Sequence, residues 1–242
     1  MSINLSLVLP CYNEEKNISI LYKEFLNIPF QGIEAELIFV NNGSEDNTSK
    51  EIDAVIDQNK SKKNSITITK VDLKINDGYG GGIAAGLNQA KGEYVGWAHA
   101  DLQTPLFDFY KLYQLIKNKK KIFGKGFRIN KRGFDGIISR FHETLASVIL
   151  GYRMQEINAQ PKIFSRDLLK YLDNIPKKWT ALDTYATYVC LKNNFEIAKI
   201  DVVFKERIYG KSKWKNNLWN FFNHILFNLL YLIKLRFSNV KK

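Results

Sequence analysis

The sequence has very little cysteine. Of its 242 residues only Cys11 and Cys190 are cysteines, which excludes a disulfide framework and any CxxC metal pair. A reducing, cytosolic compartment is therefore expected. The first five residues (MSINL) lack the basic region and the cleavage site of a signal peptide, so we expect no secretory leader. The chain also shows no internal repeat and no low-complexity tract.

A long uninterrupted hydrophobic run is also missing. Residues 218–235 are almost continuously apolar, but Asn220, Asn223, His224 and Asn228 interrupt them. Positions 220, 224 and 228 are spaced by four, which places them in one polar stripe of a helix. A bilayer span needs roughly 20 mostly apolar residues, so we expect this helix to lie in the membrane interface. A core-packed terminal helix is the alternative.

Aromatic and basic residues around this helix favour the headgroup boundary of a membrane. These residues are Trp214, Trp219, Phe221, Phe222, Tyr231, Lys213, Lys215, Lys234 and Arg236.

Acidic residues are too few to balance the basic ones. The chain has 36 Lys and Arg against 24 Asp and Glu, a formal net charge of +12. Residues 117–132 hold eight of the basic residues and residues 205–242 hold nine, and Glu206 is the only acid in either segment. Such clusters indicate phosphate partners, either nucleotides, lipid headgroups or nucleic acid, although a solvated lysine face explains part of the first cluster. No nucleic-acid recognition motif is present, so we expect no nucleic-acid partner.

The rest of the sequence is typical of a folded α/β protein. Hydrophobic residues make up 45% of the chain, and its length suits one or two domains. Segments that predict strands alternate with segments that predict helices. The expected strands are 5–9, 36–40, 66–71, 94–97 and 197–204, and the expected helices are 14–26, one ending near 56, 80–90, 105–117, 136–150, 179–193 and 218–235. This order predicts a mostly parallel sheet flanked by helices, with ligand-binding loops at the carboxyl ends of the strands.

Residues 97–105 (WAHADLQTP) are the most informative stretch. They close an expected strand and carry three metal-capable side chains at alternate positions, His99, Asp101 and Gln103. Alternate side chains at the end of a strand point to one side, so these three can converge on one cation or on its bound phosphates. A polar turn closed by Pro105 is the alternative.

Five motifs follow one another in a recognisable order. Residues 9–14 (LPCYNE) are similar to P-x-Y-N-E, residues 40–48 (VNNGSEDNT) to V-D-D-G-S-x-D-x-T, residues 76–92 to N-x-G-x-G-x-A…G-L…A-x-G, residues 99–103 (HADLQ) to D-A-D-L-Q, and residues 207–213 (RIYGKSK) to R-x-x-G-x-S-K. With these motifs the chain resembles the family-two glycosyltransferases of GT-A fold over about residues 3–213. It looks most like the branch that includes dolichol-phosphate mannose synthases and bacterial polyprenyl-phosphate glycosyltransferases.

The resemblance implies two parts of the chain. Residues 1–213 would form a GT-A (Rossmann-like) glycosyltransferase domain, a mostly parallel sheet flanked by helices. Residues 214–242 would form a basic, aromatic, amphipathic helical tail that associates with a membrane.

The resemblance also implies a nucleotide-sugar site built from strand-end loops. The residues matched to it are Pro10, Tyr12, Glu14, Asn41, Asn42, Asp46, Gly80, His99, Arg207, Lys211 and Lys213. Asn41 and Asn42 stand where the family has aspartates, and an acid there accepts the ring N–H of the base. An asparagine carbonyl can accept the same hydrogen bond without charge. The choice between uracil and guanine stays open.

Several of these residues have a structural alternative. Tyr12 could be a core aromatic, Asp46 could cap the following helix, and Gly80 could serve a simple loop-to-helix turn. Lys211 and Lys213 match a basic motif that closes over the diphosphate. They could instead attract an anionic membrane surface, with about 1 kcal/mol for each lysine.

A divalent metal, Mn²⁺ or Mg²⁺, is implied on the diphosphate of the donor, with Asp101, Gln103 and His99 as its ligands. The family has an acid at position 99. Because Mg²⁺ prefers oxygen ligands whereas Mn²⁺ tolerates imidazole better, His99 either binds Mn²⁺ or touches the diphosphate. Asp101 is the primary anchor in both cases, and we expect Asp101→Ala to abolish transfer.

On the acceptor side, Arg128 and Arg140 are matched to arginines that bind the acceptor phosphate. A lipid phosphate is already ionised at neutral pH and needs orientation more than a general base, whereas a sugar hydroxyl needs a carboxylate base. Asp183 is the candidate catalytic base, and a helix cap is its alternative. Residues 158–166 (NAQPKIFSR) depart from the family pattern, because proline or lysine replaces its glycine.

We therefore expect an inverting glycosyltransferase, monotopic on the cytoplasmic face of a bacterial membrane, that moves a sugar from a UDP- or GDP-linked donor to polyprenyl phosphate. One alternative is a transferase that extends a lipid-linked or other saccharide. Another is a non-catalytic nucleotide-sugar or lipid-binding module, because Asn41, Asn42 and His99 replace acids. The expected partners are the donor, the lipid acceptor and the membrane surface, and a homo-oligomer stays open.

Overall fold

The computed structural model describes residues 3–61, 66–130, 133–177, 179–205, 218–238 and 240–241, without the side chains of 133–135, 179–180 and 218–225. Arg207, Lys211 and Lys213, which the sequence matched to the donor diphosphate, lie outside these residues. The described elements are β1 (Leu5–Cys11), α1 (Glu15–Leu26), β2 (Ala35–Asn42), α2 (Thr48–Lys60), β3 (Ile66–Leu73), α3 (Gly78–Gln89), β4 (Tyr94–Trp97), α4 (Leu106–Ile116), β5 (Ile122–Arg128), α5 (Gly133–Leu150), β6 (Lys162–Ser165), a 3-10 helix (Arg166–Tyr171), α6 (Trp179–Lys192), β7 (Glu196–Val202) and α7 (Leu218–Arg236).

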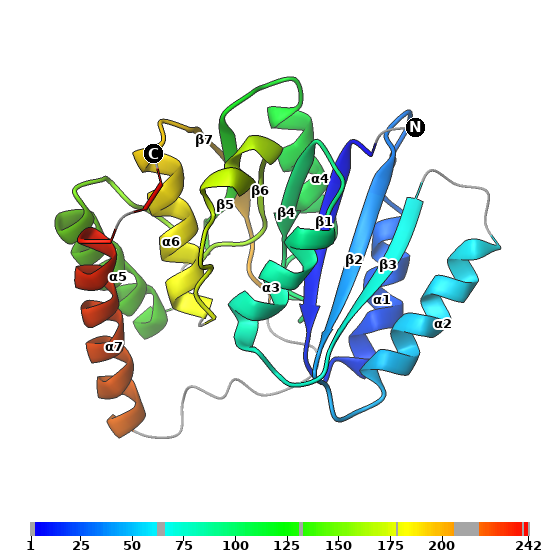
Figure 1. Ribbon diagram of the computed structural model, residues 1–242, viewed down its shortest axis with the longest axis horizontal. Helices are drawn as coiled ribbons and strands as arrows, with labels where there is room; N and C mark the ends of the chain where they lie inside the picture. The colour runs from blue at the N-terminus through cyan, green and yellow to red at the C-terminus, as the bar shows by residue number, and fades with distance from the viewer. Residues whose placement is uncertain are drawn as a thin grey trace.

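The strands form one sheet through the middle of the molecule (Figure 1). Their order is β3-β2-β1-β4-β6-β5-β7, and β6 runs antiparallel to β4 and β5 while the other neighbours are parallel. The predicted mostly parallel sheet flanked by helices is therefore confirmed. Strands β5 and β6 were not expected, because a lysine and two glycines interrupt the apolar run of β5 and β6 spans only four residues.

The strand order reverses at β1, which is where a ligand crevice is expected. The sheet grows from β1 towards β2 and β3 on one side and towards β4 on the other. Ligands of open α/β sheets bind beyond the carboxyl ends of the strands at such a reversal. The loops after β1, β2 and β4 therefore frame the candidate site.

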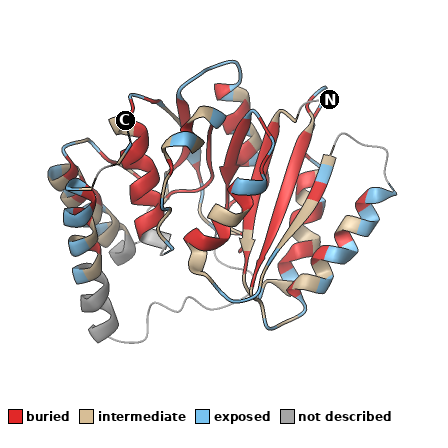
Figure 2. Ribbon diagram, viewed as in Figure 1, coloured by how far each residue is buried: buried red, intermediate tan, exposed pale blue. Residues whose placement is uncertain are grey.

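Helices cover both faces of the sheet, and each central strand alternates its side chains between two cores. Leu7 and Leu9 of β1 pack with residues of α1, α2 and α4, whereas Val8 packs with residues of α3, α5, α6 and α7. Burial on both faces is typical of parallel strands and explains their continuous apolar runs. Figure 2 shows the sheet largely buried and the outer sides of the helices exposed.

The terminal helix α7 packs against α5 and α6. Leu232 and Leu235 are buried, and Nη1 of Arg236 donates to the carbonyl oxygen of Leu150 at 3.0 Å. Asn228, a member of the expected polar stripe, is buried as well, so the described part of that stripe does not face water. Within the part of the chain that the structure describes, no helix combines the length and the apolar character needed to cross a bilayer.

Candidate functional site

Two strand-end loops are joined at the carboxyl edge of the sheet. Asn13 donates its backbone N–H to Oγ of Ser44 at 3.1 Å and accepts at Oδ1 the N–H of Glu45 at 2.9 Å. The N–H of Glu14 donates to Oγ1 of Thr48 at 2.8 Å. The φ angle of Asn13 is 58°, in the left-handed region that asparagine tolerates better than most residues. The loops after β1 and β2 thus form one floor, as their position at strand ends predicted.

Asp46 links the starts of two helices in this floor. Its Oδ1 accepts the N–H of Thr48, the first residue of α2, at 2.9 Å, and its Oδ2 accepts the N–H of Glu15, the first residue of α1, at 3.2 Å. Helix N-termini carry unpaired N–H groups and a partial positive charge, so a carboxylate stabilises both. The capping alternative therefore accounts for Asp46. Tyr12 nearby is half-buried and is not a core aromatic.

The two asparagines at the end of β2 use both ends of their carboxamides. Asn41 donates from Nδ2 to Oδ1 of Asp72 at 2.8 Å and accepts the N–H of Ser44 at 3.2 Å. Asn42 donates to the carbonyl oxygen of Gly78 at 2.9 Å and accepts a backbone N–H of the same loop at 3.0 Å. A carboxylate cannot donate, and an acid at position 41 would face the carboxylate of Asp72. The structure therefore gives a local reason for asparagine where the family has acids.

Gly80 lies against the protein backbone. Its N–H donates to the carbonyl oxygen of Lys177 at 2.8 Å, and a Cβ at this position would collide with the carbonyl oxygen of Pro176. Only glycine permits such an approach of the chain before α6 to the start of α3. Packing between two segments thus explains Gly80, and the nucleotide contact stays a prediction.

The loop after β4 brings two of the three expected metal ligands together. Nδ1 of His99 lies 3.7 Å from Oδ2 of Asp101, and the two side chains are 23% and 8% exposed. Leu102 has a φ angle of 59°, which is uncommon for a residue with a bulky side chain. Oδ1 of Asp101 accepts the N–H of Gln103 at 3.2 Å, and Nε2 of Gln103 donates to the carbonyl oxygen of Lys205 at 3.0 Å.

These residues fit a divalent cation only in part. An imidazole nitrogen and a carboxylate oxygen at this separation can share one ion, whereas Gln103 is held by the bond from its Nε2 to the carbonyl oxygen of Lys205. Over the described residues, no group of three His, Cys, Asp or Glu side chains is placed to hold a metal ion. Oxygens of a bound diphosphate would therefore be needed to complete the coordination by His99 and Asp101.

Tyr79 on α3 covers His99. The two rings meet edge to face, with 5.2 Å between their centroids and 81° between their planes. The hydroxyl of Tyr79 is buried and has no hydrogen-bond partner among the described residues. Burial raises the pKa of Tyr79 well above its usual value, and the charges of Asp183 and Asp101 raise it further. The hydroxyl is thus a neutral donor that a ligand of this loop could engage.

Asp183 is buried and paired. It lies within α6, so it is not the cap of that helix. Its Oδ1 is 2.8 Å from Nζ of Lys162, with both side chains at most 1% exposed, and Nε2 of Gln160 donates to its Oδ2 at 3.2 Å. Burial lowers the pKa of Lys162, and Asp183 opposes that shift. Both carboxylate oxygens of Asp183 are thus engaged inside the protein, and its role as the catalytic base stays a prediction.

Arg128 ends β5 beside α5. Its Nε lies 2.6 Å from Oε2 of Glu156, its Nη2 donates to Oγ of Ser139 at 3.1 Å, and its guanidinium lies over the ring of Phe204 at 5.7 Å. A guanidinium has five N–H donors, so donors remain for a phosphate. Arg140, the second arginine expected here, follows Ser139 on α5 and is exposed.

Sequence reasoning missed four polar residues in and near this site, which are Tyr79, Lys125, Gln160 and Lys162. Tyr79 stands in a glycine-rich stretch and Lys125 in a short strand. Gln160 and Lys162 lie in residues 158–166, where the departure from the family pattern left the side chains without an assigned role.

Comparison with known proteins places the chain in a family. Residues 6–176 match the family model described as Glycosyl transferase family 2. An uncharacterized glycosyltransferase of Synechocystis sp. is 29% identical over 231 residues, which cover 91% of this chain and 68% of that protein. An undecaprenyl-phosphate 4-deoxy-4-formamido-L-arabinose transferase of Serratia proteamaculans is 25% identical over 218 residues, which cover 87% of this chain. The matched part is only 62% of that transferase.

A solved structure shows the same fold. The glucosyl-3-phosphoglycerate synthase of Mycobacterium tuberculosis, crystallised with Mn²⁺, UDP and glucosyl-3-phosphoglycerate, aligns with a TM-score of 0.67 and 20% identity. The alignment covers 96% of this chain and 80% of that one. At this identity the likeness establishes the GT-A fold alone. Together with the family match over most of the chain, it shows that this protein belongs to the family-two glycosyltransferases.

Proposed function

We propose that this protein transfers a sugar from a nucleotide-sugar to a polyprenyl phosphate at the cytoplasmic face of a membrane. The observation that carries this proposal is the position of Arg128 beside α5. Helix α5 packs with α7, and both helices turn apolar side chains outward. A lipid phosphate needs a cation for its head and an apolar surface for its chain. Similarity to an undecaprenyl-phosphate sugar transferase supports the proposal.

The outward apolar surface consists of one stripe on each helix. On α5 the exposed side chains are Ile137, Phe141 and Val148, at 63%, 60% and 76% exposure. On α7 they are Leu226, Leu230 and Ile233, and Phe237 continues their helical spacing one residue after the helix ends. The two helices lie side by side in Figure 1, at the end of the sheet away from β3. Because the described part of α7 buries a polar residue and exposes apolar ones, its outer side suits lipid better than water.

Exposed basic residues accompany these stripes. Arg140 lies on α5, and Lys234 and Arg236 lie near the end of α7. Such residues attract the anionic headgroups of a membrane. We infer that α5 and α7 rest on the membrane with the acceptor phosphate near Arg128.

On the donor side we assign the nucleotide to the floor formed by the loops after β1 and β2, and the diphosphate to the loop of His99 and Asp101. The motif of Arg207, Lys211 and Lys213 would close over the diphosphate. His99 and Asp101 would hold a divalent metal, Mn²⁺ or Mg²⁺, which when bound supplies Lewis acidity to the leaving group. The related synthase crystallised with Mn²⁺ and UDP supports this class of donor.

The proposed reaction needs little proton transfer. An oxygen of the acceptor phosphate attacks the anomeric carbon, a new carbon–oxygen bond forms, and the bond from that carbon to the diphosphate breaks with inversion. Because the phosphate is already ionised, Arg128 has to orient it and no base has to deprotonate it. The ion pair of Asp183 with Lys162 suits this acceptor better than a sugar hydroxyl, which would require a free carboxylate.

Transfer to a defined lipid tests the proposal. The full chain would be incubated with labelled UDP- and GDP-sugars, undecaprenyl phosphate in vesicles, and Mn²⁺ or Mg²⁺. We expect label on the lipid phosphate itself. Label that appears only on longer lipid-linked saccharides would point to the saccharide acceptor. Nucleotide binding without transfer or donor hydrolysis, with either metal, would point to a binding module.

A further inference from the structure

Three lysines form a row across the β6–β5–β7 part of the sheet. Lys162 of β6 is paired in register with Lys125 of β5, and Lys125 is paired in register with Lys199 of β7. Residues directly opposite one another on neighbouring strands share a face, where like charges destabilise the sheet. Asp183 balances Lys162 at 2.8 Å, which leaves the charges of Lys125 and Lys199 to be explained.

Among the described residues, the hydrogen bonds of Lys125 and Lys199 go to a neutral residue. Nζ of Lys125 donates to the main-chain oxygen of Gln155, and Nζ of Lys199 donates to Oε1 of the same glutamine at 3.0 Å. Lys199 also lies over the ring of Phe127 at 5.5 Å. Lys125 is only 2% exposed, and the carboxylates of Glu143 and Asp183 only partly oppose the lowering of its pKa by burial and by the neighbouring lysines. An anion beside the two lysines would oppose that lowering further.

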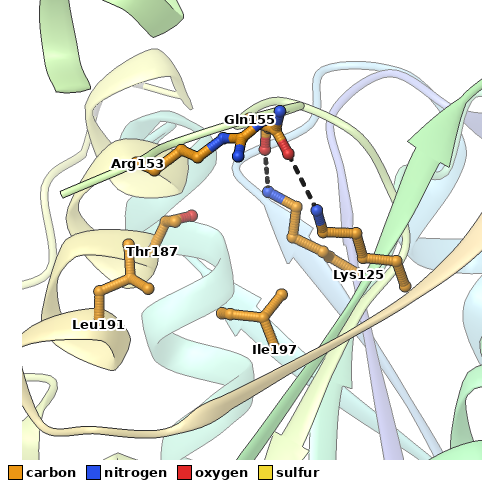
Figure 3. Close-up of a pocket in the computed structure, with 7 residues that line it drawn as sticks. Lys125, Arg153, Gln155, Thr187, Leu191 and Ile197 are labelled. Atoms are coloured by element: carbon orange, nitrogen blue, oxygen red, sulfur yellow. Dashed lines mark hydrogen bonds between the residues drawn. The ribbon is translucent and has the colours of Figure 1, made fainter.

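A cavity of about 260 Å³ opens beside the two lysines, between the sheet face and α6 (Figure 3). Its charged lining consists of Lys125, Lys199 and Arg153, joined by Gln155, Thr187 and two aliphatic side chains, and it includes no carboxylate. A water molecule takes about 30 Å³ of liquid, so the cavity has ample room for a phosphate group and for the small organic part of a monoester. A phosphate monoester carries a charge of about −1.5 to −2 at pH 7, which suits three cations.

We propose that this cavity binds a phosphate monoester, with Lys125, Lys199 and Arg153 as its charged contacts. Arginine offers a bidentate fork to phosphate, and the two lysines add point charges. The site is separate from the donor site at the ends of β1, β2 and β4, so it does not rest on the proposed function. It borders the acceptor side, because the residue after Gln155 is Glu156, the partner of Arg128.

The protonation of Lys125 gives the site a measurable signature. Burial lowers the pKa of Lys125 to about 7, and the charges of Lys162 and Lys199 contribute to this shift. A bound anion favours the ammonium form, so binding takes up protons near pH 7 and weakens as the pH rises. The charged and titratable groups that face Lys125 are Lys162, Lys199, Arg153, Glu143, Asp183 and Cys190.

Binding measurements on the full chain test the proposal. Inorganic phosphate and glycerol phosphate would be titrated by calorimetry and by thermal shift, in parallel with phosphatidylcholine vesicles that contain hexadecyl phosphate. The variants are Lys125→Met, Lys199→Gln and Arg153→Gln, and the matched control is Lys120→Gln, an exposed lysine away from the cavity. We expect saturable binding that each cavity variant weakens by about tenfold or more and the control leaves unchanged.

The soluble phosphates and the vesicles distinguish two sources of the bound phosphate. Binding of the soluble phosphates indicates a small-molecule ligand, and binding of the vesicles alone indicates a lipid headgroup. Methyl sulfate, whose charge is constant between pH 6 and pH 8, should bind the wild-type protein more tightly at pH 6 and should lose this dependence in Lys125→Met.

Two results would overturn the proposal. One is phosphate binding that is equal in the wild-type protein and in all three cavity variants, which would place it elsewhere. The other is no saturable binding of either the soluble phosphates or the vesicles. If Lys125→Met does not fold, Lys199→Gln and Arg153→Gln decide the matter, because both side chains reach the surface.

Discussion

The two halves of the sheet hold their loops by different means. Around β1, β2 and β3, the amides of Asn13, Asn41 and Asn42 join the strand-end loops. The carboxylates of Asp46 and Asp72 accept hydrogen bonds there from main-chain or amide donors. Around β5, β6 and β7, the contacts are buried charges, Lys162 with Asp183 and Arg128 with Glu156. Loss of a neutral hydrogen bond costs little, whereas loss of one partner of a buried pair leaves an uncompensated charge.

This difference matches the ligands proposed for the two halves. A nucleotide-sugar brings its own diphosphate charge and needs a floor of neutral donors and acceptors for its base and ribose. A lipid phosphate or another phosphate monoester needs fixed cations, and these are found in the half with buried charges. The following predictions test that contrast, from the largest expected effect to the smallest.

Asp101→Ala should abolish transfer. Asp101 lies 3.7 Å from His99 and is our main anchor for the metal and the diphosphate, so its loss should lower the transfer rate by about a thousandfold or more. Initial rates with labelled donor measure this, and circular dichroism checks that the fold is intact. A wild-type transfer rate for Asp101→Ala would contradict the assignment of Asp101 to the metal and the diphosphate.

Asp183→Asn should strongly destabilise the fold. The change leaves the ammonium of Lys162 buried without a counter-charge, which costs about 3–5 kcal/mol in the free energy of unfolding. Urea denaturation measures the loss, and Asp57→Asn, in an exposed ion pair with Lys60, is the matched control with almost no effect.

A second variant separates the structural role of Asp183 from a catalytic one. Lys162→Met combined with Asp183→Asn should recover most of the stability, because the unpaired charge is gone. If the double variant is stable and still transfers sugar, Asp183 is structural. If the double variant is stable and inactive, the result favours a catalytic role for Asp183.

Asn41→Asp should cost about 1–2 kcal/mol of stability and weaken donor binding. The new carboxylate would face Asp72, 2.8 Å from the present donor atom, and the loop would lose a hydrogen bond. Adding Asp72→Asn should restore the pair with its donor and acceptor exchanged. A wild-type melting temperature for Asn41→Asp alone would show that this floor does not depend on a neutral amide at position 41.

Phe141→Ser or Leu230→Ser should reduce partition into anionic vesicles by about tenfold, because each removes a large apolar side chain from the outward stripes of α5 and α7. Vesicle sedimentation measures the partition. Leu115→Ser, at a similarly exposed leucine on α4, is the control. An equal loss for the control would mean that the stripes have no special role.

The stability difference between Lys125→Met and the wild-type protein should depend on pH. The pKa of Lys125 is about 7 in the folded state and about 10.4 in the unfolded state, so between these values the unfolded state binds more protons. Wild-type stability therefore rises with pH in this window relative to the variant. The advantage of methionine should be largest below pH 7 and should shrink towards pH 10, as measured by urea denaturation at each pH.

Much of the donor half could be predicted from the sequence. Its strands are long apolar runs that end in polar turns, and its motifs are local, so the loop of His99 and Asp101 and the floor after β1 and β2 were expected. The hydrogen-bond partners of Asn41 and Asp46 were harder to predict from the sequence. Asn41 bonds to Asp72 on the neighbouring strand, and Asp46 caps two helices at once, which only the pairing of strands and loops reveals.

The other half was less predictable for a physical reason. Lys125 makes β5 look polar, and β6 is too short to show a period, so both strands were missed. The burial of each lysine depends on partners elsewhere in the chain, such as Gln155 for Lys125 and Asp183 for Lys162. From the sequence alone, a charged residue is predicted to lie at the surface as long as its partner is not known.

The sequence by itself determined the alternation of strands and helices, the order of the motifs and the family, because these rest on local periodicity and on residues close together in the chain. The tertiary structure decided which way α7 faces, which carboxylate holds Lys162, and that Lys125, Lys199 and Arg153 meet beside one cavity. These features depend on which distant segments pack together, and the electrostatic cost of a buried charge is set by that packing.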